Sequence, residues 1–185
     1  DPIQKKPIAR WMQGSTVLSV GSYGCNLRCP FCQNWQISQS GEGDVPWREV
    51  SPRELVHMAL DVRRREESAG RQMAGIAYTY NEPLVGWEYV RDCGELAHEA
   101  GLANVLVSNG CTTPQVIATL APLVDAANID LKSFSPAFYH ACGAPAGALD
   151  AVRHTIEALA AEGGCHLEVT MLVVPGMNDT DDHMQ

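Results

Sequence analysis

Short apolar runs alternate with helical patterns along most of this 185-residue chain, and that alternation limits the possible folds more than any other feature. Each run is four to eight residues long, which is typical of a strand buried on both faces of a sheet. Strands that alternate with helices are joined by right-handed βαβ crossovers and form a parallel sheet with helices outside it. The five expected strands are residues 16–20, 76–79, 104–107, 126–131 and 167–174.

Helix starts and stops lie between these runs. Ser51-Pro52-Arg53-Glu54 combines an N-cap serine, a proline at the first helical position and a glutamate that completes a capping box. Thr113-Pro114 starts another helix in the same way, and Gly101 ends the helix before it. Cys93 falls on the apolar face of that preceding helix, so we expect it in the core. The expected helices are residues 51–67, 83–100, 113–123 and 148–162, with a helical turn from residue 135.

The remaining segments have no such periodicity. Residues 1–15 are polar and contain two prolines, and we expect a lead-in in which Trp11 packs as a plug. Residues 33–50 are expected to form a loop, and residues 179–185 resemble the first turn of a further helix. We therefore predict an α/β fold, a partial barrel of about five parallel β/α units. It is expected to be a single domain over residues 1–185 that lacks its last unit.

The composition is that of a soluble globular protein of one domain, with 45% hydrophobic and 19% charged residues. A formal net charge of −9 argues against a general surface for nucleic acid or anionic membranes. No run approaches the roughly 18 apolar residues of a membrane span, and no signal peptide opens the chain. These features predict a cytoplasmic protein that binds neither nucleic acid nor membranes.

Cys25, Cys29 and Cys32 follow the first expected strand at C-x3-C-x2-C spacing, so one loop directs three thiols at a common point. A structural zinc site needs four ligands, and no second cysteine pair follows here. Three thiolates on a cubane iron–sulfur cluster leave one iron open for a substrate. A zinc site or a disulfide is the alternative. The other cysteines are expected to be reduced thiols, and Cys111 and Cys142 are the two that follow strands and approach the same edge.

Polar residues also gather where the other strands end. The carboxyl ends of parallel strands meet at one edge of a β/α barrel, and the working residues of such barrels lie there. Taken singly, each cluster has an ordinary structural explanation, such as a turn or a surface ion pair. Their shared position predicts a functional site at this edge. The clusters are the cysteine loop, residues 78–83, 108–110 and 130–132, and, on and after the fifth strand, Glu168, Thr170 and residues 175–179.

The cysteine loop resembles the radical S-adenosylmethionine (SAM) superfamily, whose signature is C-x3-C-x-aromatic-C. Cys25, Cys29, Phe31 and Cys32 match every position of that signature. The resemblance implies a TIM-type (β/α) barrel of the radical SAM core. It also implies that the three cysteines bind a [4Fe–4S] cluster and that the amino and carboxylate groups of SAM chelate the open iron.

Two subgroups are similar over longer stretches. The runs 24–35 and 78–83 are similar almost residue for residue to the AmmeMemoRadiSam group. Asn109-Gly110, residues 130–132 and residues 173–176 resemble the activating enzymes of glycyl-radical proteins, such as the pyruvate formate-lyase activating enzyme. The resemblance covers roughly residues 7 to 180.

The resemblance also suggests roles at the SAM site. Glu82 and backbone carbonyls near Asn81 are expected to accept hydrogen bonds from the SAM amino group. Lys132 is expected to pair with its carboxylate or a ribose hydroxyl, and Ser108 or Asp130 to bind the ribose. Phe31 is expected to flank the adenine. The residues predicted to contact SAM are Phe31, Tyr80, Asn81, Glu82, Ser108, Asn109, Asp130, Lys132, Thr170 and Leu172.

The implied reaction is reductive cleavage of SAM to methionine and a 5′-deoxyadenosyl radical, which abstracts hydrogen from an unidentified small molecule or protein. A low-potential donor such as flavodoxin or ferredoxin would supply the electron. The chain departs from the activating enzymes in two places. It has Asn81-Glu82-Pro83 where they place two glycines and an acid, and Val107-Ser108 where they carry the Asp-Thr of a monovalent-cation site. The alternatives are a glycyl-radical activase, a zinc-stabilised binding module and an electron-transfer protein.

Overall fold

The fold is one parallel sheet with helices on its outer face. The computed structural model describes residues 1–180, and within them the strands lie in the order β1-β2-β3-β4-β5, every neighbouring pair parallel. This order confirms the predicted α/β fold and its partial barrel. The strands are β1 (Thr16–Val20), β2 (Met73–Tyr78), β3 (Ala103–Ser108), β4 (Ala126–Asp130) and β5 (His166–Thr170).

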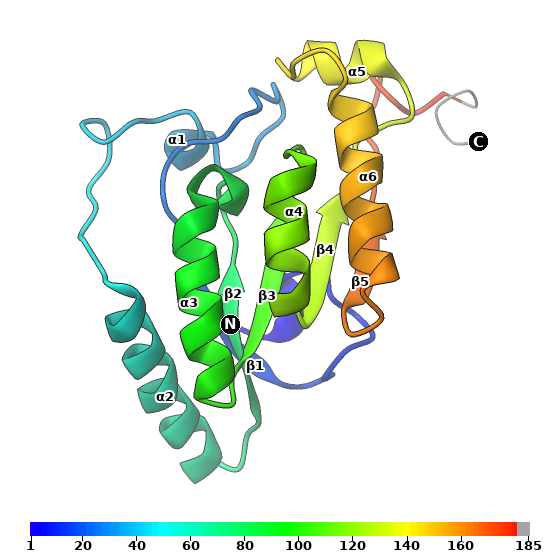
Figure 1. The fold of residues 1–185 in the computed structure, drawn as a ribbon. Coiled ribbons are helices and arrows are strands. Elements are labelled where there is room, and N and C mark those ends of the chain that lie inside the picture. Colours follow the sequence, from blue (N-terminus) through cyan, green and yellow to red (C-terminus); the bar gives the residue numbers. More distant parts are fainter. Residues whose placement is uncertain (181–185) are drawn as a thin grey trace.

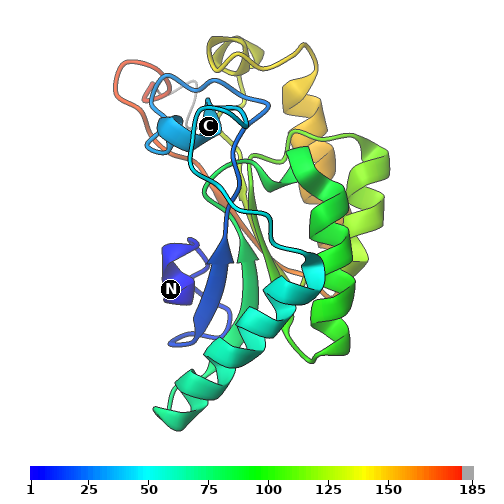
Figure 2. The same cartoon turned by 90° about the vertical axis from the view of Figure 1, so that its left-hand side faces the viewer.

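The crossover helices α3, α4 and α6 lie side by side over one face of the sheet, while α2 reaches beyond its lower edge (Figure 1). Turned by 90°, the molecule shows the N-terminal segment on the opposite face (Figure 2). No helix in the described part of the chain is long and apolar enough to cross a membrane. The helices are η1 (Ile3–Lys5), α1 (Trp35–Ser38), α2 (Pro52–Ser68), η2 (Pro83–Gly86), α3 (Trp87–Glu99), α4 (Pro114–Leu120), η3 (Ala121–Leu123), α5 (Pro136–Ala141) and α6 (Ala148–Ala161).

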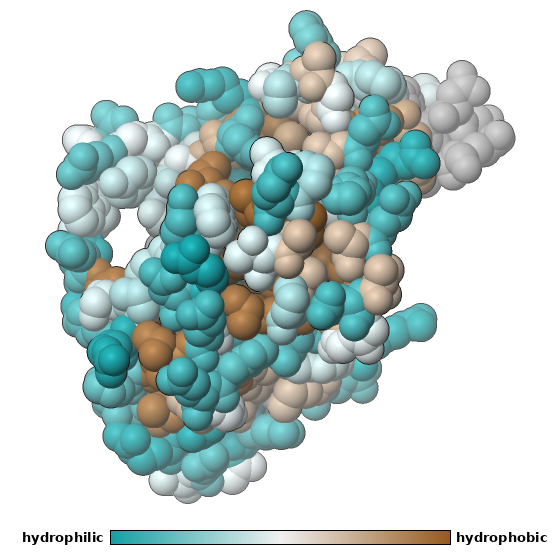
Figure 3. All heavy atoms as spheres, in the orientation of Figure 1, coloured by the Kyte–Doolittle hydropathy of each residue, from teal (hydrophilic) through white to brown (hydrophobic). Residues whose placement is uncertain are grey.

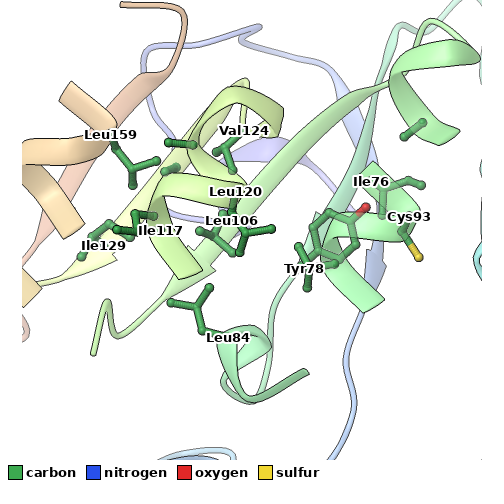
Figure 4. Close-up of a cluster of buried hydrophobic side chains, with 14 of the residues drawn as sticks. Ile76, Tyr78, Leu84, Cys93, Leu106, Ile117, Leu120, Val124, Ile129 and Leu159 are labelled. Carbon is green, nitrogen blue, oxygen red and sulfur yellow. The ribbon is translucent and has the colours of Figure 1, made fainter. Parts of the chain in front are cut away.

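The main core lies between the sheet and these helices (Figure 4). Ile76, Leu106 and Ile129 of the central strands are fully buried against Ile117 and Leu159 of the helices. Burying aliphatic side chains of this size stabilises a fold by about 1.5–3 kcal/mol each. Cys93 belongs to this core, as its position on the apolar face of α3 predicted.

A second, smaller core lies on the inner face, and it corrects the picture of residues 1–15 as a polar lead-in. Ile3 and Ile8 are fully buried there against Val17 of β1 and small alanines of β2 and β4. The small strand residues let the segment approach the sheet closely. Trp11 contacts the same cluster but is only partly buried, so the two isoleucines rather than the tryptophan fill the inner face.

Two helix starts follow the sequence. The Ser51 hydroxyl accepts a hydrogen bond from the Glu54 amide at 3.3 Å, and the Thr113 hydroxyl accepts one from the Val116 amide at 3.4 Å. The Glu54 carboxylate lies 3.5 Å from the Arg48 guanidinium. In a capping box this carboxylate would instead accept a hydrogen bond from the Ser51 amide. The cap itself is therefore as predicted, and the glutamate has a different partner.

Several boundaries differ from the sequence expectations, among them the start of the second strand, which was expected at residue 76 and lies at Met73. The expected loop 33–50 contains the short helix α1, and the helix expected from residue 83 begins as the 3₁₀ turn η2. The strand expected over 167–174 ends at Thr170, because the last residue of β4, Asp130, pairs with Thr170 and the chain beyond has no strand beside it. Of the expected turn at 179–185, residues 181–185 lie outside the described part.

The two edges of the sheet differ. The outer edge of β1 is paired with the N-terminus, where the Asp1 ammonium donates to the Val17 carbonyl at 2.9 Å and the Val17 amide donates to the Asp1 carbonyl at 2.8 Å. β5 pairs with β4 on one side, and within residues 1–180 no strand pairs with its other side. The open β5 edge agrees with the predicted strand count.

Candidate active site at the carboxyl ends of the strands

The three cysteines lie on the loop that leaves the carboxyl end of β1, and all are partly buried. The Leu27 amide donates to the Cys25 sulfur at 3.3 Å, and the Cys32 amide donates to the Cys29 carbonyl at 3.1 Å. Burial raises the pKa of Cys25, and the nearby Glu82, Cys29 and Cys32 raise it further. Cys29, Cys32 and Glu82 thus lie near the Cys25 thiol, and a common centre for the three cysteines stays a prediction.

An asparagine pair fastens this loop to the end of β3. The Asn109 amide group donates to the Asn26 side-chain oxygen at 2.8 Å and approaches the Cys25 sulfur at 3.7 Å. Asn26 in turn donates to the Cys111 carbonyl at 2.6 Å, and the Cys111 amide donates to the Asn109 side-chain oxygen at 2.8 Å. Asn109 was predicted to contact SAM. Asn26 was missed, although its place inside the cysteine motif was the available signal.

Glu82 is fully buried and joins the end of β2 to the end of β3. One carboxylate oxygen accepts from the Leu84 amide at 3.0 Å and the Ser108 hydroxyl at 2.7 Å, and the other accepts from the Asn109 amide at 2.8 Å. Burial raises the pKa of Glu82, although these three hydrogen bonds favour the carboxylate. Both oxygens thus have partners within the protein, and a direct contact from Glu82 to the SAM amino group stays a prediction.

Asn81 and Tyr80 also have partners within the protein: Asn81 binds the start of the cysteine loop, and Tyr80 binds the N-terminal residue. The Asn81 side chain accepts from the Ser22 amide at 2.9 Å and donates to the Gly24 carbonyl at 3.0 Å, so it shapes the entrance to the cysteine loop. Tyr80 has a φ of +76°, a left-handed conformation that is rare for aromatic residues. Its hydroxyl donates to the Asp1 carboxylate at 2.6 Å.

Asp130 and Lys132 form an ion pair at the end of β4, with 3.0 Å between the ammonium nitrogen and the carboxylate oxygen. The Lys132 side chain is 14% exposed. Burial alone would lower the pKa of Lys132, but Asp130 and the neighbouring Cys29 outweigh it and the pKa is raised. Lys132 therefore carries a positive charge beside the cysteine loop, where an anionic group of a ligand would find it.

The other predicted contacts are more dispersed. The Thr170 hydroxyl accepts from the Asn128 amide group at 2.7 Å, and Leu172 is 60% exposed beyond the end of β5. Phe31 packs against Phe138 of α5, with ring centroids 5.9 Å apart. A contact of Thr170, Leu172 or Phe31 with SAM stays a prediction.

Asn178 holds the segment after β5, and the sequence did not single it out within the polar run 175–179. Its side chain is fully buried and donates to the carbonyls of Lys132 and Leu172, both at 2.9 Å. It also accepts from the Val174 amide at 2.6 Å. One asparagine therefore takes over the backbone pairing that a longer strand would have supplied.

The cysteine loop also rests on the segment that follows β4. The Arg28 amide donates to the Cys142 carbonyl at 2.7 Å, and a Cβ at Gly143 would lie 3.1 Å from the Cβ of Arg28. The Cys142 side chain is fully buried and lies near the Cys29 thiol. The neighbouring Cys142 thiol and burial raise the pKa of Cys29, and the neighbouring Cys29 thiol lowers the pKa of Cys142.

The donor set fits a three-cysteine cluster. Within residues 1–180 no three side chains from His, Cys, Asp and Glu meet at a site for a single metal ion. A [4Fe–4S] cubane places a different demand on three thiols, because each binds a separate iron. One loop with three neighbouring thiols, a nearby lysine and surrounding hydrogen-bond donors meets that demand.

Two cavities of about 520 and 450 Å³ lie beside this edge rather than over the cysteines. Both are bounded by Trp47 and Arg48 of the segment between α1 and α2 and by Tyr23 before the cysteine loop. An opening is visible on the same side of the space-filling view (Figure 3). The Trp47 and Tyr23 rings lie 6.2 Å apart.

Comparison with known proteins agrees with this site. The family model described as the radical SAM superfamily matches residues 19–185. The uncharacterized protein MJ0808 of Methanocaldococcus jannaschii is 38% identical over 184 residues, which are 100% of this chain and 51% of that protein. The chain thus spans about half the length of this curated relative.

Solved structures share the fold at low identity. A structure of TYW1 with a lysine–pyruvate adduct bound superposes with a TM-score of 0.59 at 20% identity, over 87% of this chain and 57% of that one. Streptococcus suis SuiB bound to SAM gives 0.55 at 13%, over 83% and 34%. Methylornithine synthase (PylB) gives 0.56 at 11%, over 94% and 49%. The family match, which covers most of the chain including the cysteine loop, decides the assignment: this chain belongs to the radical SAM superfamily.

Proposed function

We propose that this chain carries the cluster and SAM site of a radical SAM enzyme, with Cys25, Cys29 and Cys32 as the thiolate ligands of a [4Fe–4S] cluster. When bound, the cluster and SAM supply the reductive cleavage that yields methionine and a 5′-deoxyadenosyl radical for hydrogen abstraction. The observation that carries the proposal is the joining of the cysteine loop by hydrogen bonds to Asn81 after β2, to Asn109 after β3 and to Cys142 after α5.

The role of the protein is to hold the cysteine loop in place and to orient SAM. Asn81 and Asn109 fix the two sides of the cysteine loop, and Glu82 fixes Asn109. Lys132 offers a positive charge for the SAM carboxylate or a ribose hydroxyl, provided that it exchanges its contact with Asp130. Asp130 is then free to accept hydrogen bonds from ribose hydroxyls. A rim held in this way orients SAM at little entropic cost at the moment of reaction.

Within the superfamily we assign the chain to the AmmeMemoRadiSam type rather than to the glycyl-radical activases. The activases place two glycines and an acid where this chain has Asn81-Glu82-Pro83. Here Asn81 and Glu82 both have structural partners, Asn81 in the cysteine loop and Glu82 at Ser108 and Asn109. This use of the second loop supports a distinct subgroup. The substrate, a small molecule or a protein, is not specified by these residues.

The electron for the cleavage is expected from a low-potential donor such as flavodoxin or ferredoxin, and the protein is expected in the cytoplasm, where cysteines stay reduced. The alternatives, a zinc-stabilised binding module and an electron-transfer protein, predict different results in the same experiment.

The test is anaerobic purification followed by iron, sulfide and zinc analysis and a SAM cleavage assay with dithionite. About four irons and four sulfides per chain, an oxygen-labile brown colour and 5′-deoxyadenosine formation are expected. A colourless protein with one zinc would refute the proposal, and a cluster that does not consume SAM would favour the electron carrier. The pure chain and its Cys29→Ala variant are assayed side by side.

A further inference from the structure

Tyr80, the second residue after β2, has a strained backbone. Its φ of +76° lies in the left-handed region, which costs free energy for a residue with a bulky side chain. Such a conformation persists only where the surrounding structure holds it, and these positions are frequent at functional sites. The contacts of Tyr80 show both what holds it and what it holds in turn.

The N-terminal segment holds the Tyr80 side chain from the face of the sheet opposite the crossover helices (Figure 2). The Tyr80 hydroxyl donates to the Asp1 carboxylate at 2.6 Å, and the Lys6 ammonium lies 4.3 Å from the centre of the Tyr80 ring. Lys6 is 2% exposed, and its ammonium donates to the same carboxylate at 3.3 Å. A charge buried to this extent is costly without partners, so the ring and the carboxylate keep Lys6 in place. The ring also lies against Gly21, where a Cβ would come within 3.0 Å of it.

The backbone around Tyr80 fastens both ends of the cysteine loop. The Tyr80 carbonyl accepts from the Asn34 side chain at 2.9 Å, two positions after the third cysteine. The next residue, Asn81, donates to the Gly24 carbonyl at 3.0 Å, directly before the first cysteine. The backbone angles of Tyr80 set the direction of its carbonyl and of the peptide that leads to Asn81. Two consecutive residues therefore hold the loop before its first and after its last cysteine.

We propose that Tyr80 is a positioning residue of the cysteine loop: its left-handed backbone, held by the N-terminal segment, lets its carbonyl and the next side chain fasten the two ends of the loop for the cluster and SAM. The inference rests on the proposed function. It gives Lys6 and Asp1 a role that no motif of the sequence indicated, because they act on the loop through Tyr80. A residue with an ordinary backbone conformation here would turn the carbonyl away from Asn34, and the loop would lose one of its fastenings.

The test compares Tyr80→Gly with Tyr80→Ala. Both variants remove the side chain, but only glycine adopts a φ of +76° without strain. SAM affinity and the rate of iron loss to a chelator are measured on the anaerobically reconstituted protein, and denaturant unfolding on the cluster-free protein. Tyr80→Ala is expected to lose about two- to tenfold in SAM affinity and to release iron faster by a similar factor, the range of one lost hydrogen bond. Tyr80→Gly is expected to lie closer to wild type in all three measurements.

Lys6→Met tests the link to the N-terminal segment. It removes the ammonium beside the ring, so SAM affinity should fall in the same direction as in Tyr80→Ala but by less. Lys5→Met is the matched control, because this exposed lysine lies 3.8 Å from the same Asp1 carboxylate and should leave SAM affinity unchanged. At Glu157, an exposed position within α6, the glycine and alanine variants should show the opposite order in unfolding, because glycine is the poorer residue inside a helix.

Several results would overturn the inference. Equal losses in Tyr80→Gly and Tyr80→Ala would show that the side chain acts rather than the backbone conformation. Lower unfolding stability with unchanged SAM affinity and iron release would make Tyr80 a structural residue only. Unchanged affinity in Lys6→Met would overturn the role of the N-terminal segment.

If Tyr80→Ala does not fold, Tyr80→Gly decides: wild-type SAM affinity in that variant supports the inference, and a loss of about tenfold or more overturns it. A wild-type chain that binds no iron–sulfur cluster would overturn the proposed function as well. A normal cluster with unchanged values in Tyr80→Ala overturns this inference alone.

Discussion

At the carboxyl edge of the sheet, the loops that follow β1, β2 and β3 are held differently from the segment that follows β5. Around β1, β2 and β3 the loops are joined by buried and partly buried hydrogen bonds, with Glu82, Asn81 and Asn109 as the shared partners. On and after β5 the chain carries three apolar side chains that are about half exposed or more, Val169 within the strand and Leu172 and Val173 beyond it. The contrast indicates that the cysteine side is rigid before any ligand binds, while the β5 side leaves apolar surface uncovered within the described residues.

The difference has a physical cause. A cluster needs its thiols at fixed positions, and buried polar networks give such positions because each unpaired donor or acceptor would cost about 1–3 kcal/mol. After β5 the Asn178 side chain holds the segment through three backbone contacts. The following changes would break or sharpen this contrast.

The largest effect is expected from Cys29→Ala. It removes one of three thiolates, so stable cluster binding and SAM cleavage should both be lost, as measured by iron content and 5′-deoxyadenosine formation. The double variant Cys111→Ala/Cys142→Ala is the control, and its iron content and its cleavage with dithionite should stay close to wild type. A double variant without a cluster would contradict the assignment of Cys25, Cys29 and Cys32 as the complete cysteine ligand set.

Glu82→Ala should come next, with a loss of about 3–5 kcal/mol in the free energy of unfolding, because it strands three buried donors that each cost roughly 1–3 kcal/mol. Denaturant titration of the cluster-free protein measures it. The isosteric Glu82→Gln keeps one acceptor, so its loss in the free energy of unfolding should be smaller than that of Glu82→Ala. Glu157→Ala, an exposed glutamate of α6, should change stability by less than about 0.5 kcal/mol. Equal effects at both positions would remove the basis for calling the cysteine side rigid.

Lys132→Met should weaken SAM binding without removing the cluster, because it deletes a charge and leaves the thiolates. A charge-assisted contact is worth roughly 1.5–3 kcal/mol, so a loss of about ten- to a hundredfold in affinity is expected in equilibrium binding to the reconstituted protein. Lys5→Met, at an exposed lysine, is the control. Unchanged affinity in Lys132→Met would mean that the lysine serves only as the partner of Asp130.

The smallest effect is expected from Leu172→Ala. Because this side chain is 60% exposed, the free energy of unfolding should change by less than about 0.5 kcal/mol. Leu27→Ala is the matched change within the cysteine loop, and since Leu27 is buried it should cost about 2–5 kcal/mol. Thermal and denaturant unfolding of the two variants compare the two sides directly, and a large cost at Leu172 would show that the β5 side is packed after all.

Much of the fold was readable from local patterns. Apolar runs placed all five strands, and Ser51 and Thr113 marked two helix starts, because strand burial and N-capping depend on neighbouring residues. The buried Ile3 and Ile8 were not foreseen, since their burial depends on the shape of the distant inner face. The early end of β5 was missed for the same reason: it depends on where β4 stops.

The sequence by itself determined the three-cysteine motif, the order of β/α units and the gathering of polar residues at one edge. These depend on spacing along the chain and on the rule that parallel strands share a carboxyl edge. Only the tertiary structure decided which polar groups meet there: Glu82 with Asn109, Asn109 with Asn26, and the Arg28 amide with the Cys142 carbonyl. These partners lie 27 to 114 positions apart in the chain, and a contact across such separations is fixed by the packing of whole elements rather than by any local pattern.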